Sequence, residues 1–139
     1  MDMAFVVDRL FVKGGSVILG YLASPYTHPD PKVREKRYLA AMDVVRDALL
    51  EGVETLFSPI VHSHPVGERF GLPQEWDFWR RADFPFIERC DRLYVLALPG
   101  WETSVGVAAE VEHARALGKP VLTISSWGVA YGGGMRGGA

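Results

Sequence analysis

The chain has 139 residues, of which 48% are hydrophobic and 23% are charged, and its formal net charge at pH 7 is -2. This length predicts a single domain over 1–139, and the scattered basic residues exclude a basic patch for a nucleic acid polymer or an anionic membrane. The one cysteine, Cys90, excludes an internal disulfide and is typical of the cytoplasm, where we expect the protein, and no apolar run reaches the roughly 18 residues that a membrane span needs.

The sequence pattern of the first residues does not indicate a single structure. Residues 4–13 mix apolar and charged side chains and are followed by two glycines, which fits either an extra edge strand or a leader. We therefore place the folded core at about 16–125. Residues 1–15 and the glycine-rich tail 128–139 are expected to be peripheral.

A strand, a helix and a second strand are predicted next. Residues 16–23 form a nearly continuous apolar run, as expected of a central parallel strand. Asp30 can cap a helix that has Pro31 at its first position. Apolar residues then recur at helical spacing until Gly52, a typical helix end. Residues 53–60 are predicted to be the second strand.

The second half of the chain continues the alternation. Residues 61–73, rich in Pro, Gly and His, are predicted to be a loop. Residues 74–89 have a helical pattern, which Pro85 is expected to kink or divide. Residues 92–98 are predicted to be the third strand, and residues 104–117 the last helix.

A fourth strand at 121–125 completes the order. Alternating strands and helices predict a three-layer, doubly wound α/β sandwich, flavodoxin-like or Rossmann-like, with a parallel sheet of four to five strands. Such folds bind ligands outside the carboxyl ends of their strands. We therefore expect the loops at 24–30, 60–73 and 99–104 to form a ligand cleft.

The stretch 99–120 carries the most chemical information. A helix that opens near Ser104 exposes backbone N–H groups that bind anions, to which Thr103 or Ser104 can add a hydroxyl. Gly106 lets a ligand approach the backbone closely, and Glu110 lies one to two turns further on. The alternative is that Gly106 only serves packing and that Glu110 is a solvated charge.

These residues resemble a known signature. The arrangement Ser104-x-Gly106-x-x-x-Glu110, followed by Gly118-Lys119-Pro120, is similar to that of the nucleoside 2-deoxyribosyltransferase superfamily. It resembles especially the branch that hydrolyses 2′-deoxynucleoside 5′-monophosphates. In that branch the glutamate attacks the anomeric carbon, and the serine with nearby backbone amides holds the phosphate.

Two further segments resemble the same superfamily. The string YLASPY at 21–26 is similar to its opening strand and loop, and Asp83 matches an aspartate near the base and sugar. The chain also resembles an uncharacterised bacterial and phage family with the string PGW-x-x-S-x-G. The resemblance implies ligand contacts that we assign to seven residues: Tyr21, Ser24, Tyr26, His62, Thr103, Ser104 and Gly106.

The resemblance implies an enzyme that cleaves an N-glycosidic bond or transfers deoxyribose. Glu110 would be the nucleophile and Asp83 the acid or base-positioning group, acting on a small nucleoside or nucleotide without a cofactor. Relatives assemble as homodimers or larger. Because Ser24 and Ala108 stand where glycine is common, and Ala109 where a larger side chain often packs, the alternative is a non-catalytic nucleotide sensor.

A metal site is a further alternative. His62 and His64 would point to the same side of an extended segment. No carboxylate or cysteine stands at a recognisable ligand spacing, so a polar contact from His62 to the substrate is the preferred interpretation. We therefore expect no metal.

Overall fold

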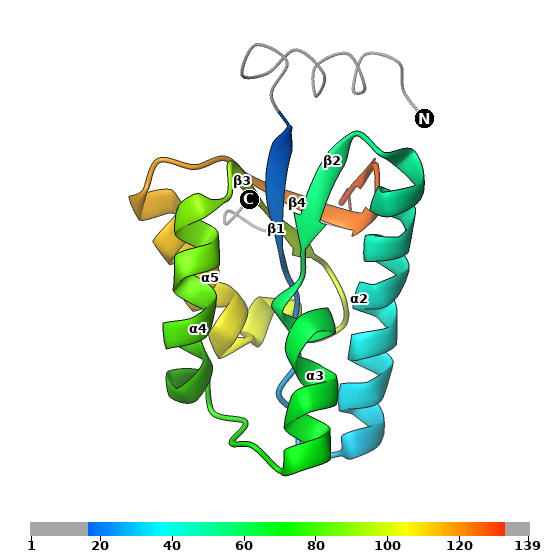
Figure 1. Cartoon of the computed structure of the whole chain (residues 1–139), viewed down its shortest axis with the longest axis vertical. Helices are drawn as coiled ribbons and strands as arrows, with labels where there is room; N and C mark the ends of the chain where they lie inside the picture. Colours follow the sequence, from blue (N-terminus) through cyan, green and yellow to red (C-terminus); the bar gives the residue numbers. More distant parts are fainter. Residues whose placement is uncertain (1–16, 133–139) are drawn as a thin grey trace.

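The computed structural model describes residues 17–132, so the expectation for residues 4–13 lies outside the described residues. Its core is a five-stranded sheet in the order β2-β1-β3-β4-β5, with helices on both faces (Figure 1). The strands are β1 (Ile18–Ala23), β2 (Glu54–Phe57), β3 (Arg92–Leu96), β4 (Val121–Ser126) and β5 (Val129–Ala130). The helices are α2 (Pro31–Glu51), α3 (Pro59–Phe70), α4 (Trp76–Arg89), α5 (Val105–Ala116) and the short 3-10 helix η2 (Trp101–Thr103).

The first four strands pair in parallel, whereas β5 pairs antiparallel with β4. The predicted doubly wound α/β sandwich is therefore confirmed, although the sequence pattern did not predict the two-residue strand β5. The chain moves from β1 to β2 on one side and then to β3 on the other. Strand order thus reverses at β1, and a ligand cleft is expected at this point.

Each sheet face has its own apolar core. Figure 1 shows α2 and α3 to one side of the strands, and α4 and α5 to the other. Because side chains alternate along a strand, Leu22 and Tyr94 pack against α2, whereas Tyr21 and Val95 face α4 and α5. This alternation sends Tyr21, a residue of the predicted site, to the face that carries α5.

The predicted first helix is confirmed in its position and in both of its ends. The Asp30 side chain accepts a hydrogen bond from the backbone N–H of Lys32, and Pro31 stands at the first position of α2. Gly52 ends the helix with a left-handed backbone (φ 73°). The helix therefore delivers its first turns to the carboxyl end of the sheet.

The predicted loop at 61–73 is wrong, and the predicted strand 53–60 is too long. β2 ends at Phe57, and α3 begins directly after Ser58, whose hydroxyl accepts a hydrogen bond from the N–H of Val61 at 3.0 Å. A serine cap followed by proline at the first helical position is a strong start signal. It outweighs Pro65 inside the helix.

Pro85 does not divide the helix in which it lies. α4 runs without interruption from Trp76 to Arg89 and ends at Cys90, where β3 follows almost at once. Within residues 17–132, no helix is both long enough and apolar enough to cross a bilayer.

Candidate active site

A cavity of about 660 Å³ opens at the carboxyl ends of β1, β2 and β3. Its walls come from the loop after β1, from α3, from α4 and from the start of α5. Seven of the nine predicted site residues line it: Ser24, Tyr26, Asp83, Thr103, Ser104, Gly106 and Glu110. Its volume is in the range of small-molecule sites. Tyr21 and His62 are not among the residues that line it.

Glu110 reaches the cavity from the buried face of α5. Val107, Glu110 and Ala114 form this face at helical spacing, and only 4% of Glu110 is exposed. Tyr21, fully buried on β1, donates a hydrogen bond from its hydroxyl to Oε2 of Glu110. Burial raises the pKa of Glu110 to about 8; the hydrogen bond from Tyr21 opposes this rise, and the charge of Asp83 adds to it.

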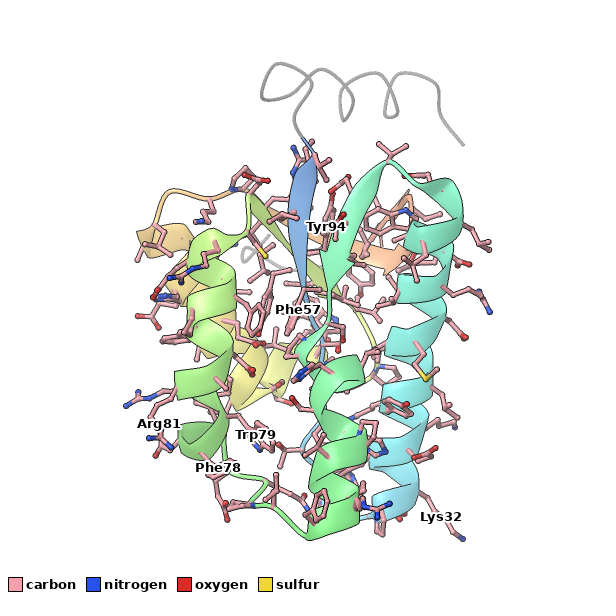
Figure 2. All side chains as sticks on the ribbon, viewed as in Figure 1. Lys32, Phe57, Phe78, Trp79, Arg81 and Tyr94 are labelled. Atoms are coloured by element: carbon pink, nitrogen blue, oxygen red, sulfur yellow. The ribbon has the colours of Figure 1, made fainter. Side chains whose placement is uncertain are left out.

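Asp83 faces the same cavity from α4. The residue is buried, and desolvation raises the pKa of its carboxyl to about 7. Figure 2 shows the neighbouring Arg81 pointing away from the helices that surround the cavity. Asp83 is therefore a carboxyl group that can hold a proton near neutral pH.

The two carboxyl groups differ in their hydrogen bonding. A cavity that raises the pKa of both groups favours a state with a single negative charge. The O–H of Tyr21 stabilises that charge on Glu110. The pKa values, about 8 for Glu110 and about 7 for Asp83, do not by themselves place the shared proton on Asp83; the hydrogen bond from Tyr21 is the feature that favours the charge on Glu110.

The first turn of α5 forms a polar end of the cavity. Ser104 caps the helix by accepting a hydrogen bond from the N–H of Val107 at 3.2 Å. The first N–H groups of a helix have no partner within the helix, and Val105 and Gly106, which carry two of them, line the cavity. A side chain at position 106 would meet the indole of Trp76 at 3.5 Å, so this turn can bind an anion beside an aromatic wall.

Arg37 connects two of the loops around the cavity. Its Nη1 donates to the carbonyl oxygens of Tyr26 and Thr27, at 3.3 and 3.1 Å, and its Nη2 donates to that of Pro99 at 3.3 Å. The guanidinium also lines the cavity, close to Gly100, whose φ is 92°. It therefore holds the loops in place and adds positive charge near the start of α5.

The helix α3 changes the interpretation of the two histidines. Residues two apart on a helix lie about 200° around its axis, so His62 and His64 do not share a side as they would on an extended segment. His64 is buried at the cavity wall, whereas His62 is exposed and lies near the ring of Phe57. Within residues 17–132, no cluster of three or more His, Cys, Asp or Glu side chains is arranged for a metal ion.

Ser24 presents an unpaired hydroxyl at the cavity. The residue is 5% exposed, and its Oγ has no hydrogen-bond partner among the described residues. A buried polar group without a partner costs free energy. A polar atom of a bound ligand would remove this cost.

The sequence model of one protein family, described as a domain of unknown function (DUF1937), matches residues 19–126. The chain belongs to this family. Among solved structures, this DUF1937 chain is similar to a 2-deoxyribosyltransferase from the psychrotolerant bacterium Bacillus psychrosaccharolyticus. The TM-score is 0.49 at 25% identity, over 81% of this chain and 76% of that one. No curated protein matches the sequence.

Several residues at the cavity of this DUF1937 chain were not predicted from the sequence. Trp76 and Trp79 line it from the first turn of α4, and Figure 2 shows Trp79 projecting into the space between α4 and α3. His64 and Glu68 line it from α3. The cap formed by Ser58 and Pro59 was the available signal, because a helix starting there places positions 60, 64 and 67 on one face.

Proposed function

We propose that this DUF1937 chain cleaves the N-glycosidic bond of a nucleotide or nucleoside. The proposal rests on one observation: two buried carboxyl groups, Glu110 and Asp83, face the same cavity, and only Glu110 receives a hydrogen bond from Tyr21. Positive charge develops on the sugar as this bond breaks, and a carboxylate beneath the anomeric carbon can capture it.

The reaction proceeds in two steps. A carboxylate oxygen of Glu110 forms a bond to the anomeric carbon while the bond from that carbon to the base nitrogen breaks. The electron pair leaves with the base, and Asp83 gives it a proton. Water, or a second base, then attacks the anomeric carbon, loses a proton to Asp83 and frees Glu110.

The start of α5 supports a 5′-monophosphate rather than an uncharged nucleoside. The first N–H groups of α5, the hydroxyl of Ser104 and the nearby guanidinium of Arg37 provide donors and positive charge for a phosphate. Thr103 lines the same end of the cavity, and its hydroxyl donates to the carbonyl of Gly100 at 3.4 Å. The indoles of Trp76 and Trp79 supply an apolar wall for a base or sugar.

The test incubates the protein with a panel of nucleotides and nucleosides and measures the release of free base. Glu110→Gln should abolish release. Glu112→Gln should leave it unchanged, because Glu112 lies on the exposed side of the same helix. If wild type releases no base from any member of the panel, glycosidic cleavage is wrong for these ligands. Binding without release, seen as a thermal shift, would instead assign the chain as a nucleotide-binding protein.

A pair of serine variants tests whether the start of α5 binds the phosphate. Ser104→Ala should weaken binding of a monophosphate more than binding of its nucleoside. Ser58→Ala removes the equivalent cap from α3, where Ser58 is buried and does not line the cavity. Both substitutions should cost about 1 kcal/mol of stability, so only the difference between the two ligands is diagnostic. An equal effect on both ligands would contradict a phosphate at α5.

A further inference from the structure

A chain of three hydrogen-bonded side chains ends at one wall of the cavity. The hydroxyl oxygen of Tyr26 lies 2.5 Å from Nδ1 of His64, and Nε2 of His64 lies 2.8 Å from Oε2 of Glu35. The three residues come from the loop after β1, from α3 and from α2. Tyr26 and His64 line the cavity, whereas the Glu35 side chain is 54% exposed.

The imidazole of His64 is fixed in its orientation. Its side chain is 5% exposed. The ring of Tyr38 stacks on it with centroids 4.2 Å apart, and the ring of Tyr26 meets it edge-on at 5.4 Å. The imidazole therefore cannot turn over to exchange its two nitrogen atoms without breaking these contacts.

This fixed orientation determines where the protons are. An ionised carboxylate only accepts hydrogen bonds, so Nε2 of His64 carries the proton that bonds to Glu35. In the neutral imidazole Nδ1 is then an acceptor, and the hydroxyl of Tyr26 must donate to it. The proton of Tyr26 is thereby engaged. Arg34 approaches the hydroxyl oxygen as one hydrogen-bond donor, and because a hydroxyl oxygen has two lone pairs, one remains to accept a hydrogen bond from a ligand.

Burial keeps the phenol in this protonated form. Burial, with a contribution from Glu68, raises the pKa of Tyr26 to about 12, and Arg34 acts in the opposite direction. Oε1 of Glu68 lies 3.9 Å from Nδ1 of His64 and accepts a hydrogen bond from Nε of Arg34 at 3.2 Å. The ion pair with Arg34 balances the charge of Glu68 beside the chain of hydrogen bonds.

We propose that Tyr26 determines ligand specificity, its hydroxyl oxygen accepting a hydrogen bond from an O–H or N–H group of the ligand, with His64 and Glu35 as positioning residues. The inference rests on the proposed function, which makes the ligand a nucleotide or nucleoside. The donor is then a sugar hydroxyl or an amino group of the base. Either group is recognised by the same oxygen, and the experiment separates them.

Binding is measured in the Glu110→Gln background, so that no ligand is turned over, and under mildly alkaline conditions, where an imidazole is neutral. One pair of ligands is a ribonucleotide and its 2′-deoxy form, and the other is a purine nucleotide with and without its amino group. Tyr26→Phe should weaken binding of the donor-bearing member of one pair about five- to tenfold. Tyr26→Phe should leave binding of the other member of that pair unchanged.

The outcomes separate the two proposals. The pair that responds assigns the donor to the sugar or to the base. If Tyr26→Phe affects both members of each pair equally, or neither, the specificity proposal is overturned and nucleotide binding still stands. If the Glu110→Gln protein binds none of the four ligands, the proposed function fails and this inference fails with it.

The positioning role of Glu35 has a readout that needs no ligand. Nitrogen-15 NMR of His64, assigned by its loss in His64→Gln, should show the proton on Nε2 in the wild type. In Glu35→Gln the carboxamide can also donate, so a fraction of the imidazole should carry its proton on Nδ1, and discrimination within the responding pair should fall. In Tyr26→Phe, Glu35→Gln should have no further effect on discrimination.

A second histidine and glutamate pair provides the matched control. Nε2 of His113 lies 3.0 Å from Oε2 of Glu88, and neither residue lines the cavity. Glu88→Gln should leave both the His64 signals and the ligand discrimination unchanged. A proton on Nδ1 of His64 in the wild type, or unchanged discrimination in Glu35→Gln, would overturn the positioning role.

Discussion

The hydroxyl of Tyr21 on β1 donates to the carboxylate of Glu110 on α5, and both residues are buried between the sheet and that helix. A carboxylate in such a place loses the solvation that water gives its charge. The single O–H group directed at it offsets part of this loss. The pair therefore links the packing of the core to the charge state of the proposed nucleophile.

Tyr21→Phe tests this link. The substitution keeps the ring and its packing against Phe57 but removes the donor, so the pKa of Glu110 should rise further. A hydrogen bond to a charged group contributes about 2 kcal/mol, and base release near neutral pH should fall at least tenfold. The ascending limb of the pH–rate profile should move to higher pH.

The matched control is Tyr94→Phe. Tyr94 also donates to a buried glutamate, Glu54, at 2.7 Å, but it lies in the core on the other face of the sheet. Tyr94→Phe should lower the melting temperature of the protein without shifting the pH–rate profile. If the pH–rate profile of Tyr21→Phe is also unshifted, Tyr21 has no role in the ionisation of Glu110.

Asp83→Asn tests the burial of the second carboxyl group through stability. The pKa of Asp83 is about 7 in the folded chain and 3.8 in an ordinary setting, so the folded protein holds a proton that the unfolded chain has released. Wild-type stability should therefore fall as pH rises from about 4 to 7. Asp83→Asn lacks this loss and should be more stable than wild type by roughly 2 to 4 kcal/mol at alkaline pH.

Urea denaturation at several pH values measures this difference. Asp77→Asn, on the exposed side of the same helix, controls for the removal of one negative charge. Asp83→Asn should also abolish base release if the Asp83 carboxyl is the acid. A stability difference between Asp83→Asn and wild type that does not change with pH would contradict a buried, protonated carboxyl.

Gly100→Ala tests the junction between the cavity loops. Gly100 has a φ of 92°, and an added Cβ would lie 2.7 Å from Nη2 of Arg37. The substitution should cost about 1 to 2 kcal/mol from the backbone and should also displace the guanidinium. Binding of a monophosphate should weaken several-fold, as measured by calorimetry.

Gly118→Ala supplies the comparison for this substitution. Gly118 has a φ of 72°, but an added Cβ meets nothing within 4 Å. It should lose a similar amount of stability and bind the monophosphate like wild type. Equal binding by the two alanine variants would show that Arg37 does not depend on the space at Gly100.

Much of the architecture was predictable because its signals are local. The Asp30 cap, the proline after it and Gly52 together define α2, and the apolar runs define the central strands. These features need only nearby residues, so a single sequence was sufficient. Helical spacing showed that Glu110 and Glu112 cannot both face the cleft, and the family resemblance, not the spacing, favoured Glu110.

The helix α3 was missed although Ser58 and Pro59 mark its start, because the composition of the segment that follows is typical of a loop. Pro65 and Gly67 lower the intrinsic helical preference of this segment, while His64 packs against Tyr26 and Tyr38. The bond from His64 to Glu35 joins residues 29 positions apart. No local pattern marks such a partner, so the hydrogen-bonded chain at the cavity wall required the three-dimensional arrangement.

Arg37 connects the two segments that border the cavity opening. Its guanidinium donates to backbone carbonyls on both sides of the opening, so a shift of the segment after β1 pulls on the segment after β3. If Tyr26 and the first turn of α5 both contact the ligand, as proposed, Arg37 would couple the two contacts. A substrate that is poorly matched at one end would be penalised at the other, and selectivity would exceed the sum of the two separate contacts.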